Sequence, residues 1–412
     1  MNFWQNFSRK LQEKKFFLWL FLFSSIFMPL FFNGCSNVRP HIKVAFDLDD
    51  NEWSIMRDKI IPEFEKKNKI VVEAIQVEKS DVLQLLKAMG SSKDTKIDIF
   101  LIDVKQLQEF VDNKMVEDIS EFGQFSNKRI NQNLIYDLYF GDRLYCVPLK
   151  INLFGLYFSN DKNNMINLSF PSNFRNFISA IKRFNKRNKS TNIVLPFSNK
   201  ESIAIFIYQT ILSSGGKPMD FGDRRTHSAF VFLKDLWNYA SPASLKANFS
   251  NILDYIQNGT PNFLWGKFSS LKMGNTKKEL LFVGSIDGAI NSKTLVDADV
   301  LCVSKGSKNK GNALKFLQYL YSHDVQKLFY SDLNWIPLRK GVIGDIRGKK
   351  QYRIILRILR RPVYIKNEKD FKEFETKAND AFTRILIKKE DISKVLKDIN
   401  EKAKKKSSTQ DL

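Results

Sequence analysis

Between residues 42 and 111 two kinds of segment follow each other in turn. Short runs are either wholly apolar or alternate apolar with polar residues, and in the longer segments between them apolar residues recur every three or four positions. The short runs are typical of strands, and the longer segments are typical of amphipathic helices. Because parallel strands need crossover connections, this alternation predicts an α/β fold with a doubly wound, mostly parallel sheet. The expected strands are residues 42–46, 70–77 and 97–102, and the expected helices lie around 53–64, 82–89 and 107–111.

The loops after these strands are the first place to expect a ligand. Ligands of doubly wound sheets bind outside the carboxyl ends of the strands. The loops that follow the first and third strands are residues 47–52 and 103–106, and both carry several polar side chains. We therefore expect a binding site to use these two loops.

The rest of the chain continues the mixture of strands and helices. Residues 144–149 and 154–158 are expected as two strands that flank Lys150-Ile151-Asn152. A length of 412 residues exceeds one ordinary core and predicts about two domains. Further expected elements are amphipathic helices within 173–240, strands at 280–283 and 298–304, helices at 312–321 and 325–330, and two more helices within 371–403.

The N-terminus has the order of a signal peptide. A basic segment containing Arg9 and Lys10 precedes an uncharged apolar run over residues 16–32, and Asn33-Gly34-Cys35 follows. This ending resembles the lipobox of bacterial lipoproteins, although Phe32 stands where Leu is usual and Asn33 is larger than the usual residue. We predict that residues 1–34 are removed and that Cys35 carries lipid. The alternative is an uncleaved anchor, because 17 apolar residues meet the lower limit for spanning a bilayer, about 17–25 residues.

The formal net charge of +22 raises the question of an anionic partner. The Lys residues are scattered and interleaved with Asn, Ile and Phe, which is typical of a solvated surface. Only residues 402–406 form a cluster of basic residues, and this cluster overlaps the start of an expected flexible basic tail at 403–412. Neither an aromatic RNA-recognition motif nor zinc-knuckle spacing accompanies the charge, so we expect no nucleic-acid partner. Attraction to a membrane surface remains open.

The motifs of common enzymes and cofactor sites are missing from the sequence. The three His residues lie in neither a HExxH nor a nucleophile-elbow context. Residues 306–312 come near a P-loop but lack the Lys-Ser/Thr pair after the second Gly. Apart from Cys35, the sequence has two cysteines, Cys146 and Cys302. They have no metal-binding spacing and cannot form a disulfide framework. We therefore expect no enzyme, no cofactor and no metal site.

Several landmarks in one order resemble the extracellular solute-binding proteins of the maltose-binding type, which serve ABC importers. The resemblance spans about residues 42–402. It departs from the family pattern where Phe158-Ser159 replaces Tyr-Asn and where Cys146 replaces Gly. The segments that carry the resemblance are Val44-Ala45-Phe46, Pro62-Glu63-Phe64-Glu65-Lys66, Ile97–Asp103, Tyr145–Pro148, Gly155–Asp161, Gly215-Gly216 with Ala229–Leu233, Asn258–Trp265, Val303–Asn309 with Ala313–Leu317, Trp335–Arg339 and Ile392–Asn400.

This resemblance implies two doubly wound α/β lobes joined by a hinge, the type II fold of periplasmic binding proteins, with ligand held between the lobes. It places Cys146 and Cys302 on neighbouring hinge strands. That leaves open a disulfide between them, although strand cysteines are more often small buried hydrophobes. The implied division is residues 35–148 with 301–345 for lobe 1, and 149–300 with 346–402 for lobe 2.

Sugar capture needs aromatic faces for the sugar ring together with polar groups for its hydroxyls, in a mostly apolar pocket. The first-strand loop, the third-strand loop, the crossover and two later segments offer such residues at the family's positions. The family's helix-borne Trp is replaced around Phe374-Glu375, so part of a stacking surface is missing. The candidate ligand-binding residues are Asp50, Asn51, Trp53, Asp103, Lys105, Lys150, Asn152, Trp265 and Tyr364.

Most of these residues also have a structural alternative. Asp50 and Asp103 could cap the helices that follow them. Trp53 is at helical spacing with Phe64, which fits core packing as well as stacking. Trp265, in a turn-rich setting, could equally form a wall, and Lys150 could be solvated on the hinge.

The function implied by the resemblance is capture of a small solute, most readily a sugar or oligosaccharide, and its delivery to the permease subunits of an ABC importer. The protein is expected to be a monomer, lipid-anchored on the extracytoplasmic face of the cell membrane. One alternative is a surface lipoprotein that no longer transports and acts as a sensor or adhesin. Another is a ligand other than a sugar, such as a glycerol phosphate or a polyamine, since Lys105 and Lys150 could meet an anionic group.

Overall fold

The computed structural model describes residues 39–412, except 90–96, 123–129, 161–172, 189–192, 250, 253, 256–262, 268–278, 285, 287, 289–292, 346–354, 357–358 and 411–412. The predicted signal peptide and Cys35 lie outside the described residues. From His41 onward the chain forms one compact unit, separate from the segment that ends at Pro40.

The main sheet has nine strands, and most of them follow the path β2-β1-β3-β10-β6-β8-β7. Strand β1 pairs in parallel with β2 and β3, while β10 pairs antiparallel with both β3 and β6. Parallel strands joined by helices confirm the predicted α/β class. The strands are β1 (His41–Phe46), β2 (Val71–Gln76), β3 (Ile99–Asp103), β4 (Tyr139–Phe140), β5 (Arg143–Leu144), β6 (Cys146–Asn160), β7 (Ile193–Val194), β8 (Phe263–Lys267), β9 (Glu279–Gly284), β10 (Thr294–Val303) and β11 (Pro362–Val363).

The helices follow the predicted apolar periodicity, with one difference in the first. The helical segment after β1 contains a π-helical turn, Met56–Ile60, between two α-helical pieces. The helices are α2 (Asp50–Ile55), η2 (Met56–Ile60), α3 (Ile61–Asn68), α4 (Val82–Met89), η3 (Val104–Gln106), α5 (Leu107–Asp112), α7 (Asn133–Tyr136), α8 (Phe174–Asn188), α9 (Lys200–Ser213), α10 (Arg224–Trp237), η5 (Pro242–Leu245), α12 (Lys310–Leu320), α13 (His323–Leu333), α14 (Lys340–Asp345), α16 (Glu368–Ala381), η6 (Phe382–Ile387) and α17 (Ile392–Gln410).

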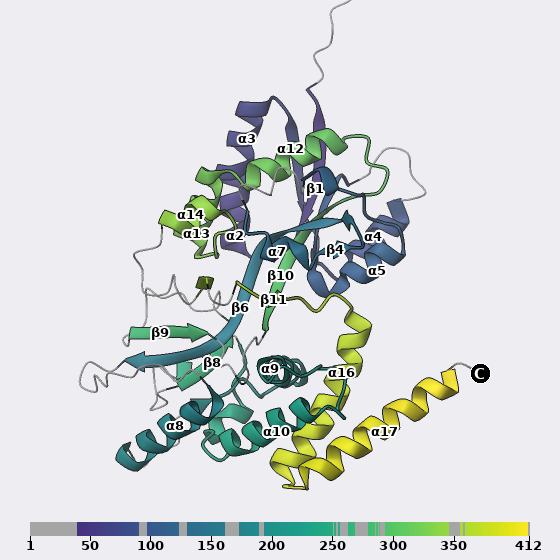
Figure 1. Ribbon diagram of the computed structural model, residues 1–412. Helices are drawn as coiled ribbons and strands as arrows, with labels where there is room; N and C mark the ends of the chain where they lie inside the picture. The colour runs from purple at the N-terminus through teal and green to yellow at the C-terminus, as the bar shows by residue number, and fades with distance from the viewer. Residues whose placement is uncertain are drawn as a thin grey trace, which may run out of the picture. The chain divides into compact units, whose positions relative to one another are not determined.

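Strand β6 corrects a prediction, because it runs without a break through Lys150-Ile151-Asn152. The polar residues 150 and 152 had indicated an interruption between two strands. Both lie opposite aspartates of β10: Lys150 is the register partner of Asp299, and Asn152 is that of Asp297. Polar side chains that face other polar groups do not break a strand, because they need not be buried against apolar atoms. Figure 1 shows β6 and β10 running side by side.

Buried apolar side chains form two large cores, and β6 and β10 contribute to both. The first core contains Phe46, Phe64 and most of β10, and the second contains Phe177, Phe230 and Phe374. Within β6, alternate residues divide between them, since Leu153 belongs to the first core and Phe154 to the second. We call β6 and β10 the cross-core strands. The two cores meet along these strands near Leu153 and Phe154 of β6 and near Leu295 and Val296 of β10.

No helix among the described residues, which begin at position 39, is long and apolar enough to cross a membrane. The apolar run at 16–32 lies outside that range, so the choice between a lipid anchor and an uncleaved helix is still a prediction.

Candidate functional site

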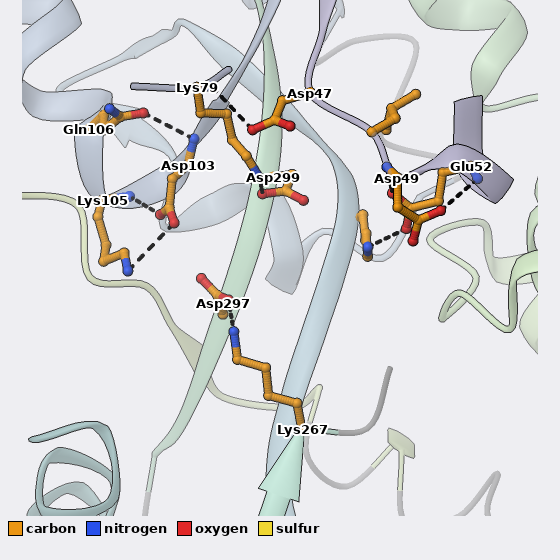
Figure 2. Close-up of polar contacts among 12 residues, drawn as sticks. Asp47, Asp49, Glu52, Lys79, Asp103, Lys105, Gln106, Lys267, Asp297 and Asp299 are labelled. Atoms are coloured by element: carbon orange, nitrogen blue, oxygen red, sulfur yellow. Dashed lines mark hydrogen bonds and ion pairs between the residues drawn. The ribbon is translucent and has the colours of Figure 1, made fainter. Parts of the chain in front are cut away.

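Charged side chains from several elements converge where β3 ends and β10 passes beside it. Figure 2 shows Lys79, Asp103, Lys105, Lys267, Asp297 and Asp299 around these strands. Glu201, the first-turn acid of α9, joins them through Lys105. We call these seven residues the charge cluster. The cluster brings together two residues predicted for the site, Asp103 and Lys105.

The backbone of β10 explains why two aspartates face this point. Asp297 and Asp299 are two residues apart, and successive side chains of a strand point to opposite faces, so both emerge on the same face. Asp299 lies directly opposite Asp103 of β3. Like charges directly opposite each other are destabilising, so this arrangement requires nearby cations.

Three lysines provide those cations. Lys79 Nζ lies 2.7 Å from Asp299 Oδ1, and Lys267 Nζ lies 3.1 Å from Asp297 Oδ2. Lys105 Nζ lies 2.8 Å from Glu201 Oε1 and 3.5 Å from Asp103 Oδ2. The Lys79–Asp299 and Lys105–Glu201 pairs join residues 220 and 96 positions apart, so only the folded chain brings them together.

Asp103 is the least well compensated carboxylate of the cluster. Burial and the neighbouring Asp297 raise the pKa of Asp103 to about 7, against the opposing effect of Lys105. Burial acts in the same direction on Asp297, but Lys267 and Lys105 outweigh it and hold the pKa of Asp297 below its usual value. Asp103 therefore exchanges its proton near neutral pH, while Asp297 stays ionised.

The charge cluster is reachable from solvent and has an excess of acid. The side chains of Lys79, Asp103, Lys105, Lys267, Asp297 and Asp299 are between 15% and 27% exposed. With all groups ionised, its four carboxylates exceed its three ammonium groups, in a chain whose net charge is +22. The arrangement can offer both hydrogen-bond acceptors and donors to a ligand while resisting further negative charge.

A small pocket adjoins the charge cluster. Lys105 and Asp297 form its polar part. Its apolar part draws on both cores, with Val104 from the first and Phe154 from the second, so this is a place where one ligand could touch both. The complete lining is Val104, Lys105, Phe154, Ile205, Leu295, Val296, Asp297 and Ile365.

A second charged group surrounds Glu52, whose side chain is only 9% exposed. Lys150 Nζ donates to Glu52 Oε1, and Trp335 Nε1 donates to the same oxygen at 3.1 Å. The Lys150 ammonium also lies 5.4 Å from the centroid of the Trp335 ring. We call these three residues the Glu52 network. The predicted site residue Lys150 is thus engaged in internal contacts with Glu52 and Trp335.

The first-strand loop is arranged differently from the prediction. The N-cap of α2 is Asp49, not Asp50: Asp49 Oδ1 accepts from the Glu52 backbone N–H at 2.8 Å, and Glu52 Oε2 accepts from the Asp49 N–H at 3.3 Å. Figure 2 shows Asp49 and Glu52 in this capping box. Asp50 and Asn51 are exposed in the first turn of α2. Neither is drawn into the charge cluster.

The three aromatic candidates pack against the cores. Trp53 is partly buried against the first core, as its helical spacing had suggested. Trp265 is 4% exposed, with its ring stacked on Phe154 at 5.6 Å between centroids. Tyr364 is 3% exposed, and its hydroxyl donates to the Leu134 carbonyl at 3.1 Å. Trp265 and Tyr364 are therefore buried, whereas Trp53 keeps part of its surface exposed.

Asp103 and Asn152 complete the set of predicted residues. Asp103 takes the alternative role of a cap, because it accepts from the Lys105 N–H at 2.8 Å at the start of η3; it also belongs to the charge cluster, and its contact with a ligand stays a prediction. Asn152 is 8% exposed on β6, opposite Asp297. The structure therefore brings Asp103, Lys105 and Asn152 to one region.

Five residues of the charge cluster were missed: Lys79, Glu201, Lys267, Asp297 and Asp299. The two aspartates carried a usable signal, since they alternate with Val296, Ala298 and Val300 in an otherwise apolar run. The predicted strand began at residue 298 and so excluded the first of them. The lysines and Glu201 carried none, because they are single charges in a chain with 66 basic residues.

Within the described parts of the chain, no group of three or more His, Cys, Asp or Glu side chains is arranged to hold a metal ion. The charge cluster itself offers hydrogen-bond acceptors on its carboxylates and donors on its ammonium groups.

Comparison with solved structures supports the fold. The chain is similar to the sugar-binding protein MalE of Xanthomonas citri, at 14% identity over 90% of this chain and 99% of that chain, with a TM-score of 0.75. It is also similar to maltose-bound MalE3 of T. maritima, at 16% identity over 88% and 99%, with a TM-score of 0.69. A third is a ribitol complex of an ABC transporter solute-binding protein from Agrobacterium radiobacter, at 14% identity over 89% and 98%, with a TM-score of 0.67.

These likenesses confirm the predicted type II fold of periplasmic binding proteins. The family model of bacterial extracellular solute-binding proteins matches residues 53–327, which include the cross-core strands and all seven residues of the charge cluster. The chain belongs to the bacterial extracellular solute-binding protein family.

Proposed function

We propose that the protein captures a small polyhydroxyl solute, a sugar or sugar alcohol, at the charge cluster and delivers it to an ABC importer. The observation that carries this proposal is the pocket beside Lys105 and Asp297, which both cores line. Carboxylates accept from ligand hydroxyls and ammonium groups donate to them, and Phe154 offers an apolar surface beside these groups. Binding then requires no chemistry beyond hydrogen bonding.

The charge balance favours a neutral solute over an anion. Lys105 is paired with Glu201 and Asp103, and Lys150 is paired with Glu52. Neither lysine is therefore available to an anion without leaving a carboxylate uncompensated. A phosphate would also lie close to Asp297, which is ionised, so like-charge repulsion opposes its entry.

The packing of the aromatic candidates favours a small solute. The rings of Trp265 and Tyr364 are packed in the cores, so they do not extend a stacking surface for a long oligosaccharide. The A. radiobacter protein with similar fold is a ribitol complex, and another similar structure, from Thermotoga lettingae, holds tagatose.

Thermal unfolding with a solute panel tests the proposal. Ribitol, tagatose and maltose represent neutral polyhydroxyl solutes, and glycerol 3-phosphate and spermidine represent charged ones. A true ligand at about 100 times its dissociation constant stabilises the fold by about 2.7 kcal/mol. We expect a shift with at least one neutral solute and none with glycerol 3-phosphate. A shift with glycerol 3-phosphate alone contradicts the proposal. The absence of a shift with every neutral solute contradicts it as well.

The mechanism that we propose is closure of two lobes around the solute, the lobes being residues 35–148 with 301–345 and residues 149–300 with 346–402. A solute between the cores contacts both of them only when they are close, so it has a higher affinity for the closed state. Small-angle scattering is expected to give a smaller radius of gyration with the bound solute. An unchanged radius with a solute that is shown to bind contradicts closure.

We further propose that lipid on Cys35 holds the protein on the extracytoplasmic face of the membrane, beside the permease. Tethering raises the effective concentration of the binding protein at its partner. Replacing Cys35 with Ser is expected to release the protein from the membrane fraction. Unchanged partitioning would assign the anchor to residues 16–32 and leave solute capture untouched.

A further inference from the structure

Cys146 and Cys302 lie at one end of the ladder between the cross-core strands. They are direct register partners in the antiparallel pairing of β6 with β10. Both side chains are fully buried, at 0% exposure, and both are free thiols in the structure. Directly opposite residues of a sheet point to the same face, so the two thiols are neighbours.

Hydrogen bonds around β10 establish which kind of pair this is. The Ser304 N–H donates to the Asp98 carbonyl at 2.9 Å, next to β3, and the Val303 carbonyl accepts from Glu117 N–H at 2.8 Å on the other side. Backbone groups of successive strand residues point to alternate sides, so the N–H and C=O of Cys302 face β3. Toward β6, Cys302 and Cys146 therefore form a non-hydrogen-bonded pair.

That pairing is the one whose side chains approach most closely. Opposite residues in a non-hydrogen-bonded antiparallel pair have Cα atoms about 4.5 Å apart, against about 5.5 Å in a hydrogen-bonded pair. Disulfides need Cα atoms about 4.4–6.8 Å apart and Cβ atoms about 3.5–4.5 Å apart. The register thus meets the Cα requirement, and the non-hydrogen-bonded pairing brings the Cβ atoms toward the lower end of their usual range of about 4.5–5.5 Å.

We propose that Cys146 and Cys302 form a disulfide in the exported protein. The oxidant is a disulfide of an exported thiol oxidoreductase, or oxidised glutathione in vitro. A thiolate of one cysteine attacks the oxidant's S–S bond, which forms a mixed disulfide and releases one oxidant thiol. The second cysteine, on losing its proton, attacks the mixed disulfide, which forms the Cys146–Cys302 bond and releases the second thiol. The oxidising compartment rests on the proposed function, whereas the pairing rests on the sheet register.

The bond must form while the sheet is still assembling. Burial, with the Cys146 thiol beside it, raises the pKa of Cys302 well above its usual value. A buried thiol with a raised pKa supplies little thiolate, and neither sulfur can be reached by an oxidant once the strands are packed. Once formed, the bond fixes the register of the two strands that join the cores.

Thiol counting on the full chain carrying Cys35→Ser tests the pairing. The chain is first unfolded in denaturant that contains reductant and is then refolded in a mixture of reduced and oxidised glutathione. Its free thiols are finally labelled with N-ethylmaleimide in denaturant. We expect no label by mass spectrometry, and a label on both Cys146 and Cys302 only after reduction. Labelling of both residues without reduction, in a chain whose circular dichroism shows the native fold, overturns the proposal.

A matched variant and a cellular sample separate the possible failures. The chain with Cys302→Ala in addition cannot form the bond, and we expect Cys146 alone to be labelled or to carry a removable glutathione. The same count on protein isolated from cells reports the compartment. Pairing after refolding with free thiols in the cellular protein would show that the sheet register permits the bond, but it would overturn the proposal that the exported protein carries it. Solute capture is read separately, from the thermal shift of each sample.

Discussion

The two charged groups beside the cross-core strands are built from similar residues but differ in what they leave unsatisfied. In the Glu52 network, one carboxylate with a 9% exposed side chain meets one lysine and one indole N–H. In the charge cluster, the acids outnumber the lysines and the carboxylates of β3 and β10 are between 15% and 26% exposed. The pocket described above is lined by the cluster's residues Lys105 and Asp297.

The difference separates a structural ion pair from a candidate binding site. A buried pair with its hydrogen bonds filled has nothing left to offer a ligand, and breaking it exposes a buried charge to an apolar environment. A partly exposed cluster with uneven charge can exchange its internal contacts for contacts to a solute. We therefore expect substitutions in the Glu52 network to affect stability, and substitutions in the charge cluster to affect solute affinity.

The largest effect is expected for Glu52→Ala. This change leaves Lys150 as a largely buried cation and leaves Trp335 Nε1 without its acceptor. Removing one partner of a buried pair costs about 3–5 kcal/mol of unfolding free energy. Urea denaturation measures it. The matched control is Glu63→Ala, which removes an exposed i,i+4 partner of Lys67 and should change stability by at most about 0.5 kcal/mol. Equal losses for both variants would remove the distinction between the two groups.

The next largest effect is expected for Asp297→Asn, which should weaken the affinity for the solute. The change keeps the shape of the side chain but replaces a charged acceptor, and hydrogen bonds to charged groups contribute about 1.5–3 kcal/mol. We expect the dissociation constant for the best solute of the panel to rise about 10- to 100-fold, measured by calorimetry. Asp332→Asn, in an exposed pair with Lys59, serves as control. If both variants bind equally well, the charge cluster is not the site.

A smaller effect is expected in the pH dependence of stability, through Asp103. Its pKa of about 7 in the folded protein exceeds the ordinary value of 3.8. Between these values the folded state holds a proton that the unfolded state has released, so stability falls as pH rises from about 4 to 7. We expect Asp103→Asn, which cannot ionise, to lessen this fall in melting temperature. The exposed Asp235→Asn is the control, and an Asp103→Asn profile parallel to it argues against a raised pKa.

The smallest effect is expected for the Lys105–Glu201 pair. The two charges lie 2.8 Å apart, but the Glu201 side chain is 53% exposed. Exposed ion pairs contribute about 0.2–1 kcal/mol, because water competes and both side chains lose rotamer freedom. A double-mutant cycle with Lys105→Met and Glu201→Gln measures this coupling. A coupling well above that range would show that this contact resembles the Glu52 network more than an open site.

The sequence by itself determined the class of fold and most of its elements. Apolar periodicity is a local property, and it located the strands at His41–Phe46 and Val71–Gln76 and the helix at Val82–Met89 to within about a residue. The order of landmarks also indicated the family and the adjacency of Cys146 to Cys302, which the register confirms. The signal peptide and the roles of the site residues remain predictions.

Only the tertiary structure decided which charges meet. Lys79 pairs with Asp299 across 220 positions of sequence, and Glu52 meets Trp335 across 283. No local pattern distinguishes these lysines and acids from others on the surface. The structure also decided that β6 runs unbroken, that Asp49 rather than Asp50 caps α2, and that Trp265 packs inward. The physical reason is shared: ion pairing, burial and pKa depend on distances that arise only when remote segments pack against one another.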